Sequence, residues 1–192
     1  MSLTQIWQII LIHQIIFQGL FFSKNIFLQH KTGLKIRGDN SEATIATIFF
    51  ALFIIITLII AYFKTPFGQF MIINQQIATM IALILMALSL VISAASLFNL
   101  GDSWRVGVIK EQKTTLVTTG IYSISRNPYF VSYIIIFIAY TIILQNITLL
   151  IGGILCTILI HQMIRKEEEY LLQTHKKSYE EYKKKTPRYL FI

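Results

Sequence analysis

The chain has few of the residue types on which soluble enzymes and disulfide-rich domains depend. It holds nine Asp and Glu residues against 17 Lys and Arg, and Cys156 is its single cysteine. One cysteine excludes an intrachain disulfide framework and a zinc site built from cysteines. The sequence also lacks a phosphate-binding loop and a GxGxxG pattern, which excludes a nucleotide-binding domain of the soluble type.

Acidic residues are also absent from the long apolar runs that make up most of the chain. Four or five of these runs are long enough to cross a hydrocarbon core of about 30 Å. We therefore predict an all-α integral membrane protein with about five transmembrane helices, near residues 3–22, 43–63, 74–98, 129–144 and 147–164. An ion pathway is not favoured, because no span contains an acidic side chain.

Several polar side chains lie inside the predicted spans. His13 and His161 have no second potential ligand three or four residues further on, so we predict hydrogen-bonded packing histidines and no metal site. The third span contains Ser89, Ser93 and Ser96, and such small residues predict close helix packing.

The basic residues are distributed unevenly between the two sets of loops. The loops after the first and third spans and the C-terminal tail carry many Lys and Arg residues, whereas the alternate loops carry only Lys64. The positive-inside rule then predicts a cytoplasmic C-terminus and an N-terminus on the outer side. This distribution accounts for the net charge of +8 without nucleic acid as a partner.

The last two spans are predicted to form a helical hairpin over residues 129–164. Gln145 and Asn146 interrupt the apolar run, and Gly152 and Gly153 permit the two arms to approach closely. A tight hairpin brings the two far ends of its arms together, so Arg126 and Arg165 are expected to lie near each other.

The chain is therefore divided into two predicted regions. Residues 1–98 contain three N-terminal transmembrane helices, and residues 99–192 contain a pre-hairpin loop, the hairpin and a cytoplasmic tail. Apolar side chains recur at helical spacing in the charged tail, and Pro187 follows them. This pattern predicts a continuation of the last span and then a cytoplasmic amphipathic C-terminal helix at the membrane surface.

The triplet Arg126-Asn127-Pro128 at the start of the hairpin has two interpretations. As a helix start, Asn127 is the N-cap, Pro128 is the first helical residue, and Arg126 extends toward lipid headgroups. As part of a site, the helix N-terminus binds a ligand carboxylate. The acidic triplet 167–169 is either a solvated charge run or the part of that site that binds an amine or hydroxyl groups.

The blocks that carry these residues resemble a known family. They are LVTTGIYSISRNPYF at residues 116–130, EExxL at 167–171, YxxYxxxxPR at 179–188, and LGDSWRVGV at 100–108. In order and spacing they resemble the isoprenylcysteine carboxyl methyltransferase family, and phospholipid N-methyltransferases share the pattern more distantly. The resemblance covers roughly the C-terminal half of the chain.

The resemblance implies an integral membrane methyltransferase that uses S-adenosylmethionine (SAM). Carried over by position, the cofactor contacts of the family fall on Thr114, Thr115, Leu116, Val117, Tyr122, Asn127, Pro128, Tyr129, Phe130 and Glu167. The chain departs from the family pattern at three positions. The family usually has His at Asn127 and Tyr at Phe130, and its eukaryotic enzymes have a substrate-binding Arg at Met163.

The predicted function is methyl transfer to a lipophilic substrate within the bilayer, namely carboxyl O-methylation of an isoprenylcysteine-like group on a prenylated small molecule or peptide. We predict Arg165 and Glu168 as catalytic residues. Arg165 is the arginine near the substrate position of the family, and Glu168 is the candidate base for an amine acceptor.

Three alternatives stay open at the sequence level. One is a phospholipid N-methyltransferase, and another is a non-catalytic membrane scaffold. The third is an NADPH-dependent enzyme like the sterol reductases, for which the pre-hairpin loop offers only Lys110 and Lys113 as phosphate ligands. No oligomeric state is predicted.

Overall fold

The computed structural model describes residues 3–38, 40–107, 109, 112 and 115–190, and these residues form an all-α fold. The helices are α1 (Leu3–Thr32), α2 (Ser41–Phe63), α3 (Gln75–Leu100), α4 (Pro128–Leu144), α5 (Ile147–His175) and α6 (Lys177–Lys185). Short 3-10 turns occupy Gly101–Ser103 and Gly120–Ser123. The predicted fold class is confirmed.

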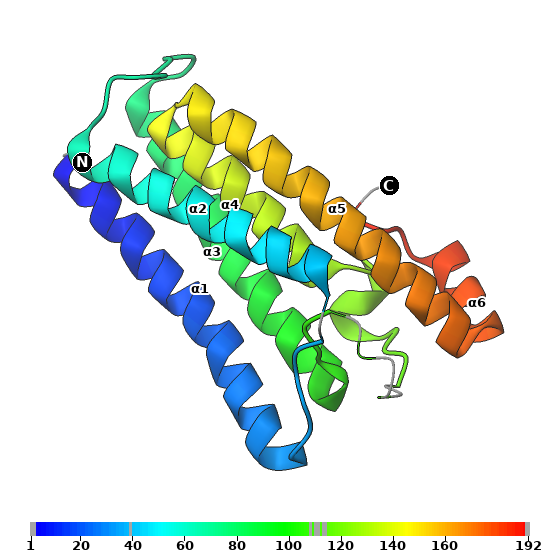
Figure 1. Ribbon diagram of the computed structural model, residues 1–192. Helices are drawn as coiled ribbons and strands as arrows, with labels where there is room; N and C mark the ends of the chain where they lie inside the picture. Colours follow the sequence, from blue (N-terminus) through cyan, green and yellow to red (C-terminus); the bar gives the residue numbers. More distant parts are fainter. Residues whose placement is uncertain (1–2, 39, 108, 110–111, 113–114, 191–192) are drawn as a thin grey trace.

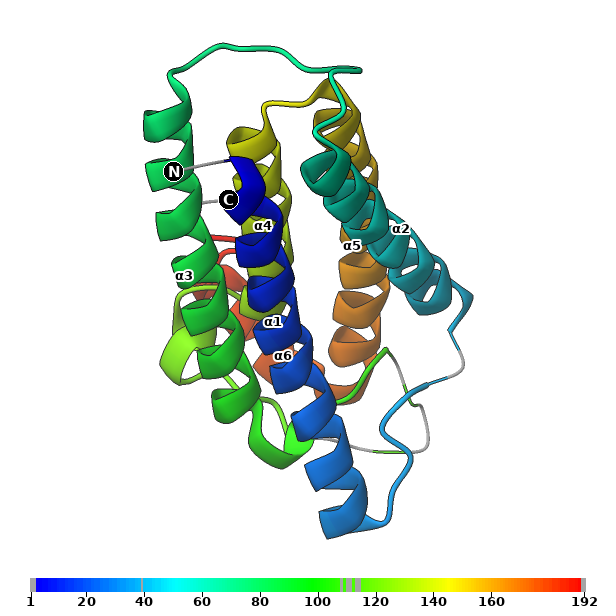
Figure 2. The same ribbon diagram turned by 90° about the vertical axis from the view of Figure 1, so that its left-hand side faces the viewer.

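The five longer helices form a bundle, and α6 lies beside the far end of α5 (Figures 1 and 2). That end, which also contains the described residues between α3 and α4, is called the α6 end below. The opposite end contains the turn between α4 and α5 together with the loop from α2 to α3, and is called the turn end. The predicted helical hairpin is the α4–α5 pair.

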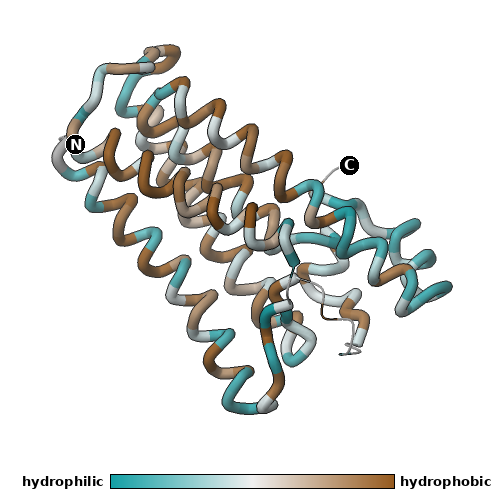
Figure 3. The backbone as a smooth tube through the Cα atoms, in the orientation of Figure 1, coloured by the Kyte–Doolittle hydropathy of each residue, from teal (hydrophilic) through white to brown (hydrophobic). Residues whose placement is uncertain are grey.

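The four helices α1, α2, α3 and α5 are long and apolar enough to cross a membrane, and α4 is a shorter apolar helix. Apolar residues follow the helices of the bundle, whereas hydrophilic residues concentrate at α6 and the adjoining turns of α5 (Figure 3). The protein is therefore a multi-pass membrane protein. The first helix continues to Thr32, well beyond the predicted end of its span.

Helix α5 extends beyond the hydrocarbon core. Its 29 residues span about 43 Å at 1.5 Å per residue, against about 30 Å for the core. The charged sequence begins at Arg165, so the turns after Ile164 lie outside the apolar layer. The structure thus confirms the predicted continuation of the last span.

Small residues permit the close packing of α5. A Cβ atom added at Gly153 would lie 3.1 Å from the Cβ of Phe137 in α4, and one at Gly152 would lie 3.2 Å from the ring of Phe53 in α2. Gly152 therefore permits the close approach of α2 to α5, whereas Gly153 permits the close approach of α4, the other arm of the hairpin. The serines of α3 are fully buried, which agrees with the close helix packing that they predict.

Both histidines in the spans are hydrogen-bonded, as predicted. Nδ1 of His13 lies 2.7 Å from the hydroxyl oxygen of Tyr140, and Nδ1 of His161 lies 2.8 Å from that of Tyr189. The first bond joins α1 to α4, and the second joins α5 to the C-terminal segment. Each satisfies polar groups that would be costly to leave unpaired in an apolar layer.

Candidate functional site

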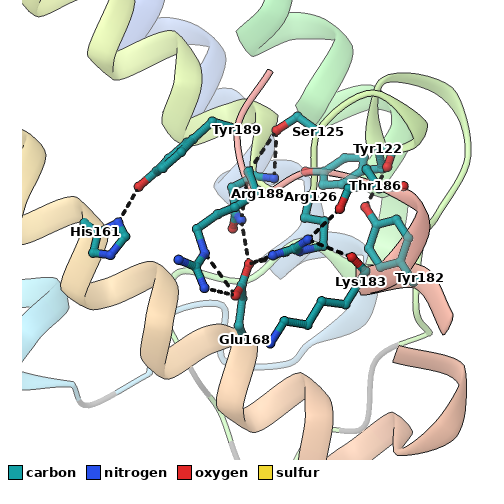
Figure 4. A network of polar contacts seen from close by, with 11 residues as sticks. Tyr122, Ser125, Arg126, His161, Glu168, Tyr182, Lys183, Thr186, Arg188 and Tyr189 are labelled. Atoms are coloured by element: carbon teal, nitrogen blue, oxygen red, sulfur yellow. Dashed lines mark hydrogen bonds and ion pairs between the residues drawn. The ribbon is translucent and has the colours of Figure 1, made fainter. Parts of the chain in front are cut away.

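A buried ion-pair network joins three segments at the α6 end (Figure 4). Oε1 of Glu168 accepts hydrogen bonds from Nε and Nη2 of Arg126 at 3.1 and 3.0 Å. Oε2 accepts from Nε and Nη2 of Arg188 at 3.1 and 2.8 Å. The side chain of Glu168 is 8% exposed and that of Arg126 is 7% exposed. The prediction that the Arg126 side chain extends toward lipid headgroups is therefore wrong.

Asn127 belongs to the same network. Its Nδ2 donates to Oε1 of Glu168 at 3.3 Å and to the carbonyl oxygen of Arg188 at 3.2 Å. Pro128 is the first residue of α4 as predicted, but the Asn127 side chain makes no capping hydrogen bond. Asn127 is the N-cap residue as predicted, but its side-chain amide is turned toward Glu168 and does not cap the helix.

The C-terminal segment is held against the loop before α4 by further hydrogen bonds. The backbone N–H of Arg126 donates to the carbonyl of Pro187 at 2.9 Å, and the Tyr182 hydroxyl donates to the carbonyl of Tyr122 at 2.6 Å. Tyr179 and Tyr182, the buried face of α6, pack at this junction. The tail, the loop and α5 thus form one unit.

The two arginines determine the charge state of Glu168. Burial alone raises the pKa of a carboxyl group, but hydrogen bonds and charges from Arg188 and Arg126 outweigh it and hold the pKa of Glu168 below its usual range. A carboxylate with a low pKa and both oxygens engaged by guanidinium groups is a weak proton acceptor. The geometry therefore suits a positioning role for Glu168 and not the predicted role of a base.

A cavity of about 690 Å³ lies among α1, α2, α4, α5 and the loop before α4. Small-molecule sites typically measure roughly 300–1,000 Å³. Most of the polar lining residues lie at the α6 end, namely Arg37, Ser103, Arg105, Gln112, Thr115, Tyr122, Arg126, Asn127, Glu167, Tyr170, Tyr179 and Tyr182. The polar lining residues of α1 and α2 are Gln14, Gln18 and Thr47. The lining from α1 and α2 is mostly apolar. The cavity therefore suits a ligand with a polar part and a long apolar part.

Glu167 faces this cavity and contrasts with its neighbour. Among the lining residues that the structure describes it is the only carboxylate. No hydrogen bond or ion pair joins it to a described residue. Burial, and then the negative charge of Glu168, raise the pKa of Glu167 to about 7. A carboxylate held in this way is stabilised by a cationic or hydroxyl-bearing ligand.

Most of the cofactor residues predicted from the resemblance line the cavity. They are Thr115, Leu116, Val117, Tyr122, Asn127, Tyr129, Phe130 and Glu167. Pro128 is buried but does not line the cavity. Thr114 lies outside the described residues, as do Lys110 and Lys113.

The two predicted catalytic residues do not line the cavity. Glu168 is buried in the ion-pair network, and Arg165 is exposed. The residue of α5 that meets Arg126 is Glu168 and not Arg165. Met163 lines the cavity, so the family position for a substrate-binding arginine faces the site with an apolar side chain.

Sequence reasoning missed three arginines of the site. Arg37 and Arg105 line the cavity from irregular loops, and Arg188 completes the network from the C-terminal segment. Arg105 and Arg188 lie within blocks that carry the family resemblance, which was the available signal. Arg37 lies in the loop between α1 and α2, where neither periodicity nor a motif marks it.

The structure is that of a membrane protein with charged residues at one end of a largely apolar cavity. The model of the phospholipid methyltransferase family matches residues 77–178, and no curated protein matches the chain. The chain therefore belongs to the phospholipid methyltransferase family, whose members are membrane methyltransferases that act on lipid-type substrates with SAM as the methyl donor. The matched residues cover most of α3 and all of α4 and α5, whereas α1 and α2 lie outside them.

Proposed function

We propose that this protein is a SAM-dependent carboxyl O-methyltransferase whose acceptor is a lipophilic, isoprenylcysteine-like molecule. The observation that carries the proposal is Glu167, a carboxylate that pairs with no described residue and lies at the polar end of a largely apolar cavity. Membership of the phospholipid methyltransferase family supports methyl transfer over the NADPH-dependent and non-catalytic alternatives.

The residues around the cavity fit the polar groups of SAM. The Glu167 carboxylate binds the amine or the ribose hydroxyls, and both groups supply hydrogen-bond donors, which its oxygens lack among the described residues. The start of α4 lies in the same wall, with Asn127, Tyr129 and Phe130 lining the cavity. Its first N–H groups suit a carboxylate, since helix N-termini favour negative charge.

When bound, SAM supplies an electrophilic methyl group on a sulfonium. The residues of the chain position this group and exclude water from it. The network of Glu168, Arg126 and Arg188 holds α5, the loop and the tail in fixed relation, so Glu167 and the start of α4 keep their spacing. Such preorganisation can contribute several kcal/mol to a two-reactant step.

The charges at the α6 end favour a carboxylate as the methyl acceptor. If Glu167 binds the cofactor, no second carboxylate or histidine remains among the described lining residues to act as a base. A carboxylate acceptor is already nucleophilic and needs no base. Arg37 and Arg105 line the same end and are suited to hold such an anion.

The acceptor enters from the bilayer between α1 and α2. Ile15 and Phe22 of α1 and Ile55 of α2 line the cavity, although they are 63%, 58% and 52% exposed. A side chain that is both exposed on the outer surface and part of the cavity wall marks an opening. The apolar character of this opening suits a lipid tail.

N-methylation of a lipid amine is the second candidate function. A carboxyl group with a pKa of about 7 is well matched to a base that works near neutral pH, and Glu167 meets this condition. In this candidate Glu167 faces the acceptor amine and not the cofactor. The family match also favours a phospholipid acceptor.

The products of methyl transfer separate the two candidates. Membranes containing the protein are incubated with methyl-labelled SAM, and the labelled lipids and prenylated peptides are treated with mild base. We expect a label that base releases as methanol, and we expect Glu167→Gln to abolish labelling while Glu169→Gln, a change at an exposed neighbour, retains it. A base-stable label would establish N-methylation instead, and the absence of label in every fraction would contradict both candidates.

A further inference from the structure

The segment that joins α2 to α3, residues 64–74, carries large apolar side chains on its outside. Phe67, Met71 and Ile72 are 79%, 75% and 79% exposed. Lys64 is the only charged residue between positions 43 and 101. A cluster of exposed apolar side chains of this size marks a contact surface and is not typical of a loop in water.

The backbone of this segment is turned inward, onto the α4–α5 turn over which it passes (Figure 2). The N–H of Phe70 donates to the carbonyl of Gln145 at 2.8 Å, and the N–H of Ile147 donates to the carbonyl of Gly68 at 2.8 Å. A Cβ atom added at Gly68 would lie 3.0 Å from Cγ2 of Ile147. The segment therefore lies directly against the turn.

The two polar side chains of the turn complete this pairing. Oε1 of Gln145 accepts from the N–H groups of Ile72 and Ile73 at 3.0 and 3.2 Å, and Nδ2 of Asn146 donates to the carbonyl of Phe67 at 2.9 Å. In water, solvent would satisfy such backbone groups. In an apolar layer, non-helical backbone is tolerated only where protein groups satisfy it, and this arrangement meets that requirement.

The length of α4 places the turn below the far boundary of the membrane. The 17 residues of α4 span about 25 Å, against about 30 Å for the hydrocarbon core. Arg126 and Asn127, which precede α4, bond to Glu168 in the part of α5 that lies outside the apolar layer. Measured from there, the turn falls about 5 Å short of the opposite boundary of the core.

Neighbouring side chains at the turn end are those of a membrane interface. The rings of Trp7 in α1 and Tyr62 in the last turn of α2 have their centroids 5.5 Å apart, and Trp and Tyr are enriched at the level of the headgroups. The long stem of Lys64 permits its ammonium group to reach the headgroups from the same depth. Ile59 and Phe63 of α2 are 48% and 69% exposed, so the apolar surface continues from α2 into the segment.

We propose that residues 65–73 lie in the bilayer, in the leaflet at the turn end, with Phe67, Met71 and Ile72 among the lipid acyl chains just below the headgroups. In this position the segment covers the α4–α5 turn and separates its polar groups from lipid. The placement also sets the depth of the protein. The turn end is immersed, whereas the α6 end, with the polar part of the cavity, lies at the opposite face of the membrane.

Thiol reactivity at two positions of the segment tests this placement. Cys156→Ala removes the one native thiol, and Phe67→Cys or Ile72→Cys is added in this background. Ile59→Cys is the lipid-facing control, and Lys185→Cys, at an exposed position of α6, is the control in water. The full chain is placed in lipid nanodiscs, where both membrane faces are open to solution, and is treated with a charged thiol reagent. We expect positions 67 and 72 to react at least about tenfold more slowly than position 185, because an apolar layer excludes the charged reagent and disfavours the thiolate.

A nitroxide label attached to Ile72→Cys distinguishes lipid from a covering protein. Its collisions are measured with molecular oxygen, which concentrates in lipid, and with a nickel chelate that stays in water. We expect frequent collisions with oxygen and few with the chelate, as at Ile59→Cys. Frequent collisions with the chelate, or a reaction as fast as that of Lys185→Cys, would overturn the proposal by placing the segment in water. Few collisions with either reagent would overturn it in favour of a second protein chain. Neither measurement involves SAM, so both are independent of the proposed function.

Discussion

An asparagine stands immediately before each helix of the hairpin, Asn127 before α4 and Asn146 before α5, and the side chains of the two make different contacts. At the turn end, the side chain of Asn146 accepts from the N–H of Thr148 at 2.9 Å and caps α5. At the α6 end, Asn127 occupies the same position before α4 but directs its amide to Glu168. The comparison shows that the α6 end gives up a local helix cap to complete a network of charges.

The other contacts at the two ends differ in the same way. The turn end is closed by neutral hydrogen bonds to backbone, in which Oε1 of Gln145 accepts from the N–H groups of Ile72 and Ile73 and Asn146 donates to the carbonyl of Phe67. The α6 end is held by the Glu168 ion pairs and is hollowed by the cavity. One end stabilises the hairpin, and the other forms the site.

The largest expected effect on stability is that of Glu168→Gln. Removing the carboxylate leaves two arginines without their partner, and breaking a buried pair in this way costs about 3 kcal/mol of unfolding free energy. Glu169→Gln, at an exposed neighbour, should change it by less than about 0.5 kcal/mol. Chemical unfolding in detergent micelles measures both variants. Equal stability of Glu168→Gln and wild type would show that the network does not stabilise the α6 end.

The pH dependence of SAM binding tests the role of Glu167. Its pKa is raised to about 7, so below neutral pH the unliganded carboxyl is mostly protonated, whereas a cationic ligand binds the charged form. Affinity should therefore increase as pH rises, roughly tenfold between pH 5.5 and 7, while the α-amino group of SAM stays protonated. Glu167→Gln should remove this dependence. A flat wild-type profile would exclude Glu167 as the group that binds the cation.

Substitutions of Asn146 and Asn127 are expected to have smaller effects, but they separate stability from ligand binding. Asn146→Ala removes a helix cap and should cost about 1 kcal/mol of stability, with SAM affinity unchanged. Asn127→Ala removes no cap but loosens the start of α4 at the cavity, so SAM affinity should fall by a few-fold. Paired unfolding and binding measurements on the two variants check this. The contrast between the ends would be lost if both variants changed only stability.

The smallest effect is expected for an ion pair on the surface. Lys31 and Asp102 are joined at 2.8 Å, with their side chains more than half exposed. Such a pair is solvated and screened by salt. Lys31→Met should leave the thermal unfolding midpoint unchanged within error, at both low and high salt. A clear decrease in the midpoint would mean that exposed ion pairs, and not only buried ones, stabilise the α6 end.

The sequence was sufficient for the helices and for part of the site. Apolar runs of membrane-spanning length specified the bundle, and the interruption at Gln145 and Asn146 specified the hairpin. Glu167 and the start of α4 came from the family resemblance and not from periodicity. The helices were predicted correctly because each depends on a local pattern, and the contiguous motif marked residues that line one cavity, whereas their binding of the cofactor stays a prediction.

The remaining features depend on contacts that no local pattern encodes. Arg188 reaches Glu168 because the chain folds back after α5. The sequence around Arg188 has no pattern that specifies this change of direction. Asn127 is a favoured cap residue in a capping position, yet a tertiary charge decides where its amide points.

The central claim is that Glu167 holds the methyl donor, and calorimetry with the purified protein tests it most directly. SAM is titrated into the wild type, Glu167→Gln and the exposed control Glu169→Gln at pH 7. We predict binding of SAM to the wild type and the control, and at least about tenfold weaker binding to Glu167→Gln, as the loss of a charge-assisted hydrogen bond implies. No heat of binding to the folded wild type at millimolar SAM, or equal affinity in all three proteins, would contradict the claim.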